Sequence, residues 1–120
     1  MLIIENNSIF LNRGDDAALN VEITDNAGEI YDLRPGDSLT LTVRAVPAAD
    51  SPVLLTAASA ASAITLTHSM TAQMEVGQYS TDVELILANG SRITVWPVLT
   101  GNARFKEKNY KNFTIMSEVT

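Results

Sequence analysis

The sequence predicts an all-β protein, an antiparallel β-sandwich of about seven to nine short strands. Three observations predict this fold. Apolar and polar residues alternate along several short segments, as they do in half-buried strands. Turn-forming residues separate these segments, and no long segment has the spacing of a helix. Because 46% of the 120 residues are hydrophobic, we expect one folded domain spanning residues 1–120.

The N-terminal part of the chain predicts two or three strands. Apolar runs at 2–4 and 9–11 indicate either one kinked first strand or two separate strands. Leu19, Val21 and Ile23 then alternate with polar residues. This spacing predicts one strand with a single buried face.

Alternation is clearest in the middle of the chain. Residues 38–44 predict a strand whose leucines and valine lie on one face. Residues 53–56 predict a short strand, and the Ala- and Ser-rich residues 57–62 fit either a loop or one helical turn. Ile64 and Leu66 indicate the next strand.

The C-terminal half continues this pattern. Residues 69–74 predict a short helix that crosses between sheets, and residues 79–87 predict a long strand. A return strand follows at 92–96, then a polar loop at 101–108 and a terminal strand at 109–119.

The corners between strands are predicted from turn chemistry. Pro-Gly favours a type II turn, because proline fixes φ at the first central position and glycine accepts a positive φ at the second. Asn-Gly predicts a two-residue type I′ hairpin. The residues assigned to turns and strand starts are Gly14, Asp15, Pro35, Gly36, Gly77, Tyr79, Asn89 and Gly90.

Gly77 and Tyr79 add detail to the predicted architecture. A tyrosine two residues after a glycine, at the start of a long strand, resembles the tyrosine corner of immunoglobulin-like sandwiches. In that corner the phenol hydroxyl binds backbone a few residues upstream. The fold class is therefore predicted as an immunoglobulin-like antiparallel β-sandwich, without the cysteine pair of antibody domains.

Charge and composition disfavour several functions. A net charge of −6 opposes binding to phosphate backbones, so we expect no nucleic-acid partner. The basic residues Arg104, Lys106, Lys108 and Lys111 are interpreted as a solvated edge or a protein contact. No apolar run is long enough to cross a bilayer, and no signal peptide is recognised, so we expect no membrane partner and synthesis in the cytoplasm.

The polar motifs indicate no active site. Arg13-Gly14-Asp15 is interpreted as a turn rather than an adhesion signal. His68 is the only histidine and there is no cysteine, so neither a multi-histidine metal site nor a thiol nucleophile is available. The loop aspartates lack the spacing of a calcium loop. We therefore expect a protein that is not an enzyme, with no catalytic residue, cofactor or metal.

Aromatic residues concentrate in the last quarter of the chain. Aromatic side chains are enriched at the centres of protein interfaces. If Ile93 and Val95 face the core, Trp96 points outward by alternation; the alternative is that the same chain covers it. The candidate interface residues are Ile86, Trp96, Phe105, Tyr110 and Phe113.

Three stretches resemble the N-terminal domain of phage baseplate upper proteins and related small prophage proteins. They are IFLNRGDD at 9–16, DLRPGDSLTLTV at 32–43 and GQY at 77–79. The resemblance implies an immunoglobulin-like sandwich that docks onto the tail hub of a virion, with Arg-Gly-Asp as a turn. Longer members continue into a coiled coil and a receptor-reaching region, whereas this sequence stops at Thr120, so host binding is not carried over.

The resulting expectation is a structural protein of a phage tail or baseplate, located in the virion. It would act as a protein–protein docking or adaptor module, hub-bound or as a homo-oligomer, with other tail and baseplate proteins as partners. The alternative is a small carbohydrate- or receptor-binding β-sandwich module that uses an exposed aromatic platform around Trp96.

Overall fold

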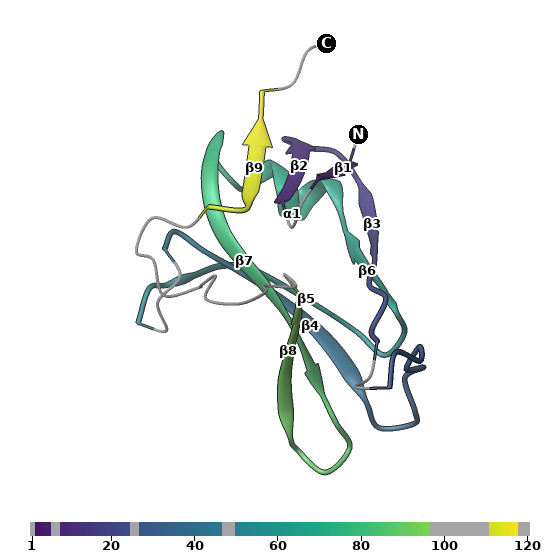
Figure 1. Ribbon diagram of the computed structural model, residues 1–120. Helices are drawn as coiled ribbons and strands as arrows, with labels where there is room; N and C mark the ends of the chain where they lie inside the picture. Colours follow the sequence, from purple (N-terminus) through teal and green to yellow (C-terminus); the bar gives the residue numbers. More distant parts are fainter. Residues whose placement is uncertain (1, 6–7, 25–26, 47–49, 97–110, 118–120) are drawn as a thin grey trace.

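The computed structural model describes residues 2–5, 8–24, 27–46, 50–96 and 111–117 (Figure 1). Within these ranges the chain forms strands and one short helix. In chain order the elements are β1 (Leu2–Glu5), β2 (Ser8–Asn12), β3 (Ala17–Asn20), β4 (Ser38–Arg44), β5 (Val53–Ser59), β6 (Ala63–Leu66), α1 (His68–Ala72), β7 (Gly77–Ile86), β8 (Arg92–Trp96) and β9 (Phe113–Met116).

These strands form two layers. The large sheet has the order β1-β2-β9-β7-β4-β5, and β8 also pairs with β7; the small sheet consists of β3 and β6 (Figure 1). In the large sheet, β7 lies between β4 on one side and β8 and β9 on the other, and β5 lies beyond β4. This sheet faces the β3–β6 pair, and the order follows the strand arrangement of immunoglobulin-type sandwiches. The predicted all-β sandwich is confirmed.

The large sheet is mixed rather than purely antiparallel. β2 and β9 run parallel, with Ile9 opposite Phe113 and Leu11 opposite Ile115. Parallel neighbours need a long connection, and most of the domain lies between these two strands in the sequence. The sequence predicts a purely antiparallel sandwich, and that prediction is wrong at the β2–β9 pair.

The core comes from the inward faces of both sheets. Leu39, Leu41 and Val43 of β4 are fully buried, as the alternation at 38–44 predicts. β7 contributes Val83 and Leu85 to the same core. The other layer and the remaining elements contribute Ile9, Leu11, Leu19, Val21, Leu55, Ala57, Ile64, Leu66, Met74, Phe113 and Ile115.

The structure resolves one choice that the sequence leaves open. The apolar runs at 2–4 and 9–11 are two antiparallel strands, with Leu2 opposite Leu11. The prediction of a loop or one helical turn for residues 57–62 is wrong for 57–59, because Ala57 and Ser59 pair with β4 as part of β5; only 60–62 lie outside the strand. Their small side chains fit the pleated surface of the sheet beside β4.

The hairpin between β7 and β8 differs from the predicted two-residue turn. Leu87 N–H donates to Ser91 O at 2.8 Å, and Gly90 N–H donates to Leu87 O at 2.8 Å. The connection therefore has three residues, Ala88, Asn89 and Gly90, and Gly90 has a φ of 90°. A three-residue hairpin loop with a left-handed glycine in its last position is a common alternative for Asn-Gly sequences.

Tyr79 forms the corner expected at the start of β7. Its hydroxyl donates to Glu75 O at 2.6 Å, four residues upstream. α1 lies just before this corner, with Thr67 as its N-cap. The bond fixes the direction in which the chain leaves α1 and enters the long strand.

One edge of β7 pairs with two different strands, β8 and β9. β8 pairs with Val83–Ile86 and β9 pairs with Gly77–Tyr79, so neither strand covers Thr81. The buried Asn112 side chain fills this gap. Thr81 N–H donates to Asn112 Oδ1 at 2.8 Å, and Asn112 Nδ2 donates to Thr81 O at 2.9 Å. The amide thereby supplies both hydrogen bonds that a strand backbone would supply.

Replacing this amide should destabilise the domain. Asn112→Ala leaves a donor and an acceptor of Thr81 without partners, and we expect a loss of about 2–4 kcal/mol in the free energy of unfolding. Urea unfolding measures the loss. Asn20→Ala, at an exposed position of β3, is the matched control and should stay within about 0.5 kcal/mol of wild type. Equal stability of the two variants would contradict the bridging role of Asn112.

Candidate protein-binding surface

The Arg-Gly-Asp sequence forms the turn between β2 and β3. Gly14 has a φ of 85°, and Asp15 N–H donates to Asn12 O at 3.1 Å. Arg13 is tied into the fold, since its Nε donates to Met74 O at 2.8 Å and its backbone N–H donates to Met116 O at 2.9 Å. An adhesion loop needs this guanidinium free on a tip, and here it joins three segments of the fold.

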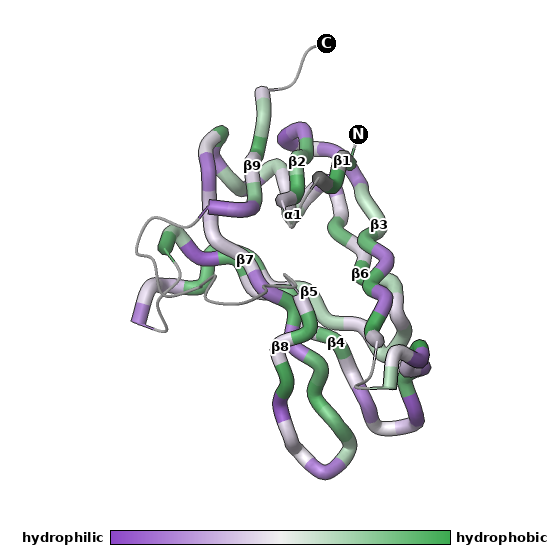
Figure 2. The backbone as a smooth tube through the Cα atoms, in the orientation of Figure 1, coloured by the Kyte–Doolittle hydropathy of each residue, from purple (hydrophilic) through white to green (hydrophobic). Residues whose placement is uncertain are grey.

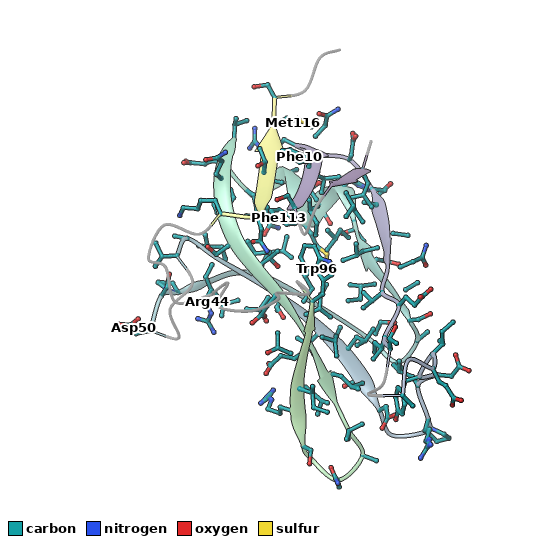
Figure 3. The ribbon with its side chains drawn as sticks, in the orientation of Figure 1. Phe10, Arg44, Asp50, Trp96, Phe113 and Met116 are labelled. Atoms are coloured by element: carbon teal, nitrogen blue, oxygen red, sulfur yellow. The ribbon has the colours of Figure 1, made fainter. Side chains whose placement is uncertain are left out.

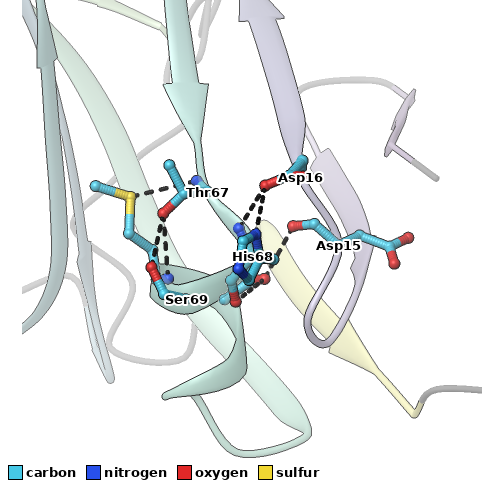
Figure 4. A network of polar contacts seen from close by, with 7 residues as sticks. Asp15, Asp16, Thr67, His68 and Ser69 are labelled. Carbon is cyan, nitrogen blue, oxygen red and sulfur yellow. Dashed lines mark hydrogen bonds and ion pairs between the residues drawn. The ribbon is translucent and has the colours of Figure 1, made fainter.

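Asp16 and His68 form a polar cluster beside this turn (Figure 4). His68 N–H donates to Asp16 Oδ1 at 2.6 Å, and the ring Nδ1 lies 3.2 Å from the same oxygen. The hydroxyl of Ser69 lies 3.2 Å from Thr67 Oγ1. Aspartate, histidine and serine therefore lie near one another, but the contact of Asp16 with His68 joins the start of α1 to the β2–β3 turn. This arrangement is not that of a nucleophile and its base.

A second cluster centres on Asp37. Its carboxylate accepts hydrogen bonds from Tyr31 OH at 2.5 Å, from Arg34 N–H at 3.0 Å and from Ala88 N–H at 3.1 Å. The bond from Tyr31 is the main cause that lowers the pKa of Asp37, and the same bond raises the pKa of Tyr31. The cluster joins the turn at Gly36 to the β7–β8 hairpin. This structural role accounts for the shifted pKa values of Asp37 and Tyr31.

The turn at Pro35 and Gly36 is the type II turn predicted from the sequence. Asp37 N–H donates to Arg34 O at 2.9 Å, and Gly36 has a φ of 91°. A Cβ atom at Gly36 would lie 2.8 Å from the Cβ of Ala88. Glycine is thus required here both by the backbone conformation and by the close approach of the neighbouring hairpin.

Carboxylates also lie on the outer face of the large sheet. Burial raises the pKa of Asp82, the charge of Glu84 raises it further, and Arg44 opposes the change. Glu84 Oε1 lies 3.9 Å from Arg92 Nε. Among the residues that the structure describes, no group of three or more histidine, cysteine, aspartate or glutamate side chains could hold a metal ion.

No helix within the described ranges is long and apolar enough to cross a membrane.

The predicted interface residues that the structure describes, Ile86, Trp96 and Phe113, do not form one exposed surface. Phe113 is fully buried, which corrects its assignment to a docking surface, because β9 continues the sheet inside the sandwich. Trp96 lies opposite Val83 and packs against the core (Figure 3). A bulge in β8 reverses the alternation and turns Trp96 to the core side, so of the two orientations that the sequence left open the outward one is wrong.

Ile86 is half-buried at the end of β7, opposite Ser38 and Arg92. Phe105 and Tyr110 lie outside the described residues.

Three of the exposed aliphatic side chains lie on the two sides of the β4–β5 connection. Val46, Val53 and Leu54 are 36%, 49% and 47% exposed, and we call these three residues the hairpin patch. Val53 lies opposite Arg44, and Leu54 is the extra residue of a bulge. Figure 2 shows hydrophobic residues at this end of the β4–β5 connection. Sequence reasoning missed the patch because Val53 and Leu54 look like the start of an ordinary strand, and Val46 lies beyond the strand predicted at 38–44.

Two cationic side chains hold the base of this hairpin. Arg44 donates through a guanidinium nitrogen to Ser51 O, across the connection between the strands. Lys111 Nζ donates to Ala45 O, which ties the hairpin to the segment before β9. The hairpin patch is therefore presented on anchored backbone, as a binding surface requires.

Substitution of Gly36 should cost more than substitution of a comparable glycine. Gly28 also has a positive φ, 82°, but a Cβ atom added there would have no neighbouring atom within 4 Å. We expect Gly36→Ala to lower the free energy of unfolding by about 2–4 kcal/mol and Gly28→Ala by about 1–2 kcal/mol. Denaturant unfolding of both variants measures the difference, and equal losses would show that the contact with Ala88 is unimportant.

The Asp37–Tyr31 pair should make the free energy of unfolding fall at both acid and alkaline pH. The lowered pKa of Asp37 means that its contribution is present above the ordinary aspartate range and is lost as the pH falls through the folded-state value. The raised pKa of Tyr31 means that its contribution is lost as the pH rises through its own folded-state value.

Thermal unfolding across the pH range checks this prediction. We expect Tyr31→Phe to weaken the alkaline loss that comes from this pair, and Asp37→Asn to weaken the acid loss. Profiles that keep the wild-type shape at both ends would refute the assignment to this cluster.

Comparisons with protein-family models, with curated proteins and with solved structures found no match. The resemblance to phage baseplate upper proteins therefore stays a prediction from the sequence.

Proposed function

We propose that this protein is a non-enzymatic structural component of a phage or prophage tail or baseplate, located in the virion. It acts as a docking or adaptor module for other tail and baseplate proteins. The observation that carries the proposal is the hairpin patch, formed by Val46, Val53 and Leu54 on an anchored hairpin. The sequence resemblance supplies the class of partner.

Two features support a binding role over a catalytic one. The Asp16–His68 and Asp37–Tyr31 clusters, which contain the most reactive residue types, each join two segments of the fold. By contrast, the hairpin patch makes an apolar surface that burial against a partner would stabilise. A chain of net charge −6 also remains soluble while it presents such a patch.

The carbohydrate-binding alternative has less support. It depends on Trp96 as an exposed stacking platform, and Trp96 packs against the core on the side of Val83. We therefore retain the docking proposal alone.

Co-purification tests the proposal. The tagged protein is expressed together with the products of the genes that flank its own gene, and we expect a tail or baseplate protein to be retained. Val46→Asp combined with Leu54→Asp should reduce that retention at least tenfold, because charges replace the apolar contact. Val76→Asp is the control, since Val76 is 54% exposed outside the hairpin patch, and should bind as wild type.

Either of two results would overturn the proposal. One is the absence of any tail or baseplate protein among the retained partners. The other is equal retention by the double variant and the control, with circular dichroism showing that both are folded.

A further inference from the structure

β5 ends one side of the large sheet. It pairs with β4 from Leu39 opposite Ser59 to Arg44 opposite Val53, and no other described strand pairs with it. An antiparallel strand bonded on one side directs alternate N–H and C=O groups away from the sheet. These groups can accept another strand.

β5 has few of the features that block such pairing. Natural edge strands usually carry lysine or other charges, or a proline. Val53–Ser59 reads VLLTAAS, with no charged residue, proline or glycine. Its bulge lies at the start of the strand, between Val53 and Leu55, and the register from Leu55 to Ser59 is regular.

The exposed face of β5 is complementary to itself. Leu54, Thr56 and Ala58 are exposed, whereas Leu55 and Ala57 face the core. Thr56 is the middle residue of the strand. If two copies pair antiparallel about Thr56, the large Leu54 of each copy lies opposite the small Ala58 of the other, and the two Thr56 side chains lie opposite each other.

We propose that two copies of this chain associate through β5, in antiparallel register about a two-fold axis at Thr56. Pairing in this register places Thr56 opposite Thr56 and Leu54 opposite Ala58, and leaves Val53, beside the bulge, opposite Ser59. The two large sheets then become one continuous sheet.

β5 itself adds no repulsion between two copies. Although the chain has a net charge of −6, Val53–Ser59 contains no charged residue, so no like charges face each other along the paired strands. This inference goes beyond the proposed docking function. The two surfaces share Val53 and Leu54, so Val46→Asp, which lies in the hairpin patch but outside β5, separates a loss of docking from a loss of pairing.

Disulfide trapping tests the register directly. The chain has no cysteine, so Thr56→Cys introduces a single thiol. Residues directly opposite each other in an antiparallel pair have Cα atoms about 4.5–5.5 Å apart, within the range that a disulfide spans. We expect mild oxidation to give mainly covalent dimer. Thr94→Cys, at an exposed position of β8, is the control and should remain mainly monomeric.

Light scattering of the protein without cysteine completes the test. We expect a mass that rises toward twice that of the monomer with concentration, and a monomer mass for both Thr56→Lys and Ala58→Lys. Val46→Asp, which lies outside β5, should still dimerise.

A monomer mass for wild type at every concentration, or equal crosslinking of the two cysteine variants, would overturn the β5 pairing. So would pairing with an unrelated extended peptide in place of a second copy. Failure to retain a tail protein would leave the pairing intact and would count only against the docking function.

Discussion

The structure depends on β7, the strand through which most of the large sheet is connected. One edge of β7 pairs with β4 along seven residues, and the other edge pairs with β8 and β9. Its inward side chains, Val83 and Leu85, are among those that hold the two layers together. Because the second edge is built from two strands, its continuity rests on one buried amide, Asn112, that replaces a backbone unit at Thr81.

The polar clusters have a common structural role. The Asp16–His68 contact joins the β2–β3 turn to α1, and the Asp37 carboxylate joins two corners of the large sheet. The Tyr79 hydroxyl holds the approach to β7. A sandwich without disulfides needs such connections, because apolar burial stabilises the layers but is non-directional and does not fix the conformation of the loops. Side-chain hydrogen bonds fix that conformation.

The sequence was sufficient to predict the strands that bury one face. Residues 38–44 and 79–87 alternate with period two, and burial follows this alternation throughout 38–44 and from Thr81 to Ile86. The Pro35–Gly36 turn was also predictable, because its geometry depends on local backbone preferences. The orientation of Trp96 was not, since a bulge in β8 reverses the alternation and leaves no local signal. The hairpin patch was missed for a related reason: exposure depends on which strand lies at the edge, and only the tertiary arrangement decides that.

The divided edge of β7 has a consequence for how this domain can change. Trp96 and Asn112 are both fixed to β7, at positions only a few residues apart along the strand. The sheet therefore fixes two points of the chain, one on each side of Thr81, to the same edge of β7. A change that displaces either Trp96 or Asn112 would act on the same short stretch of that strand.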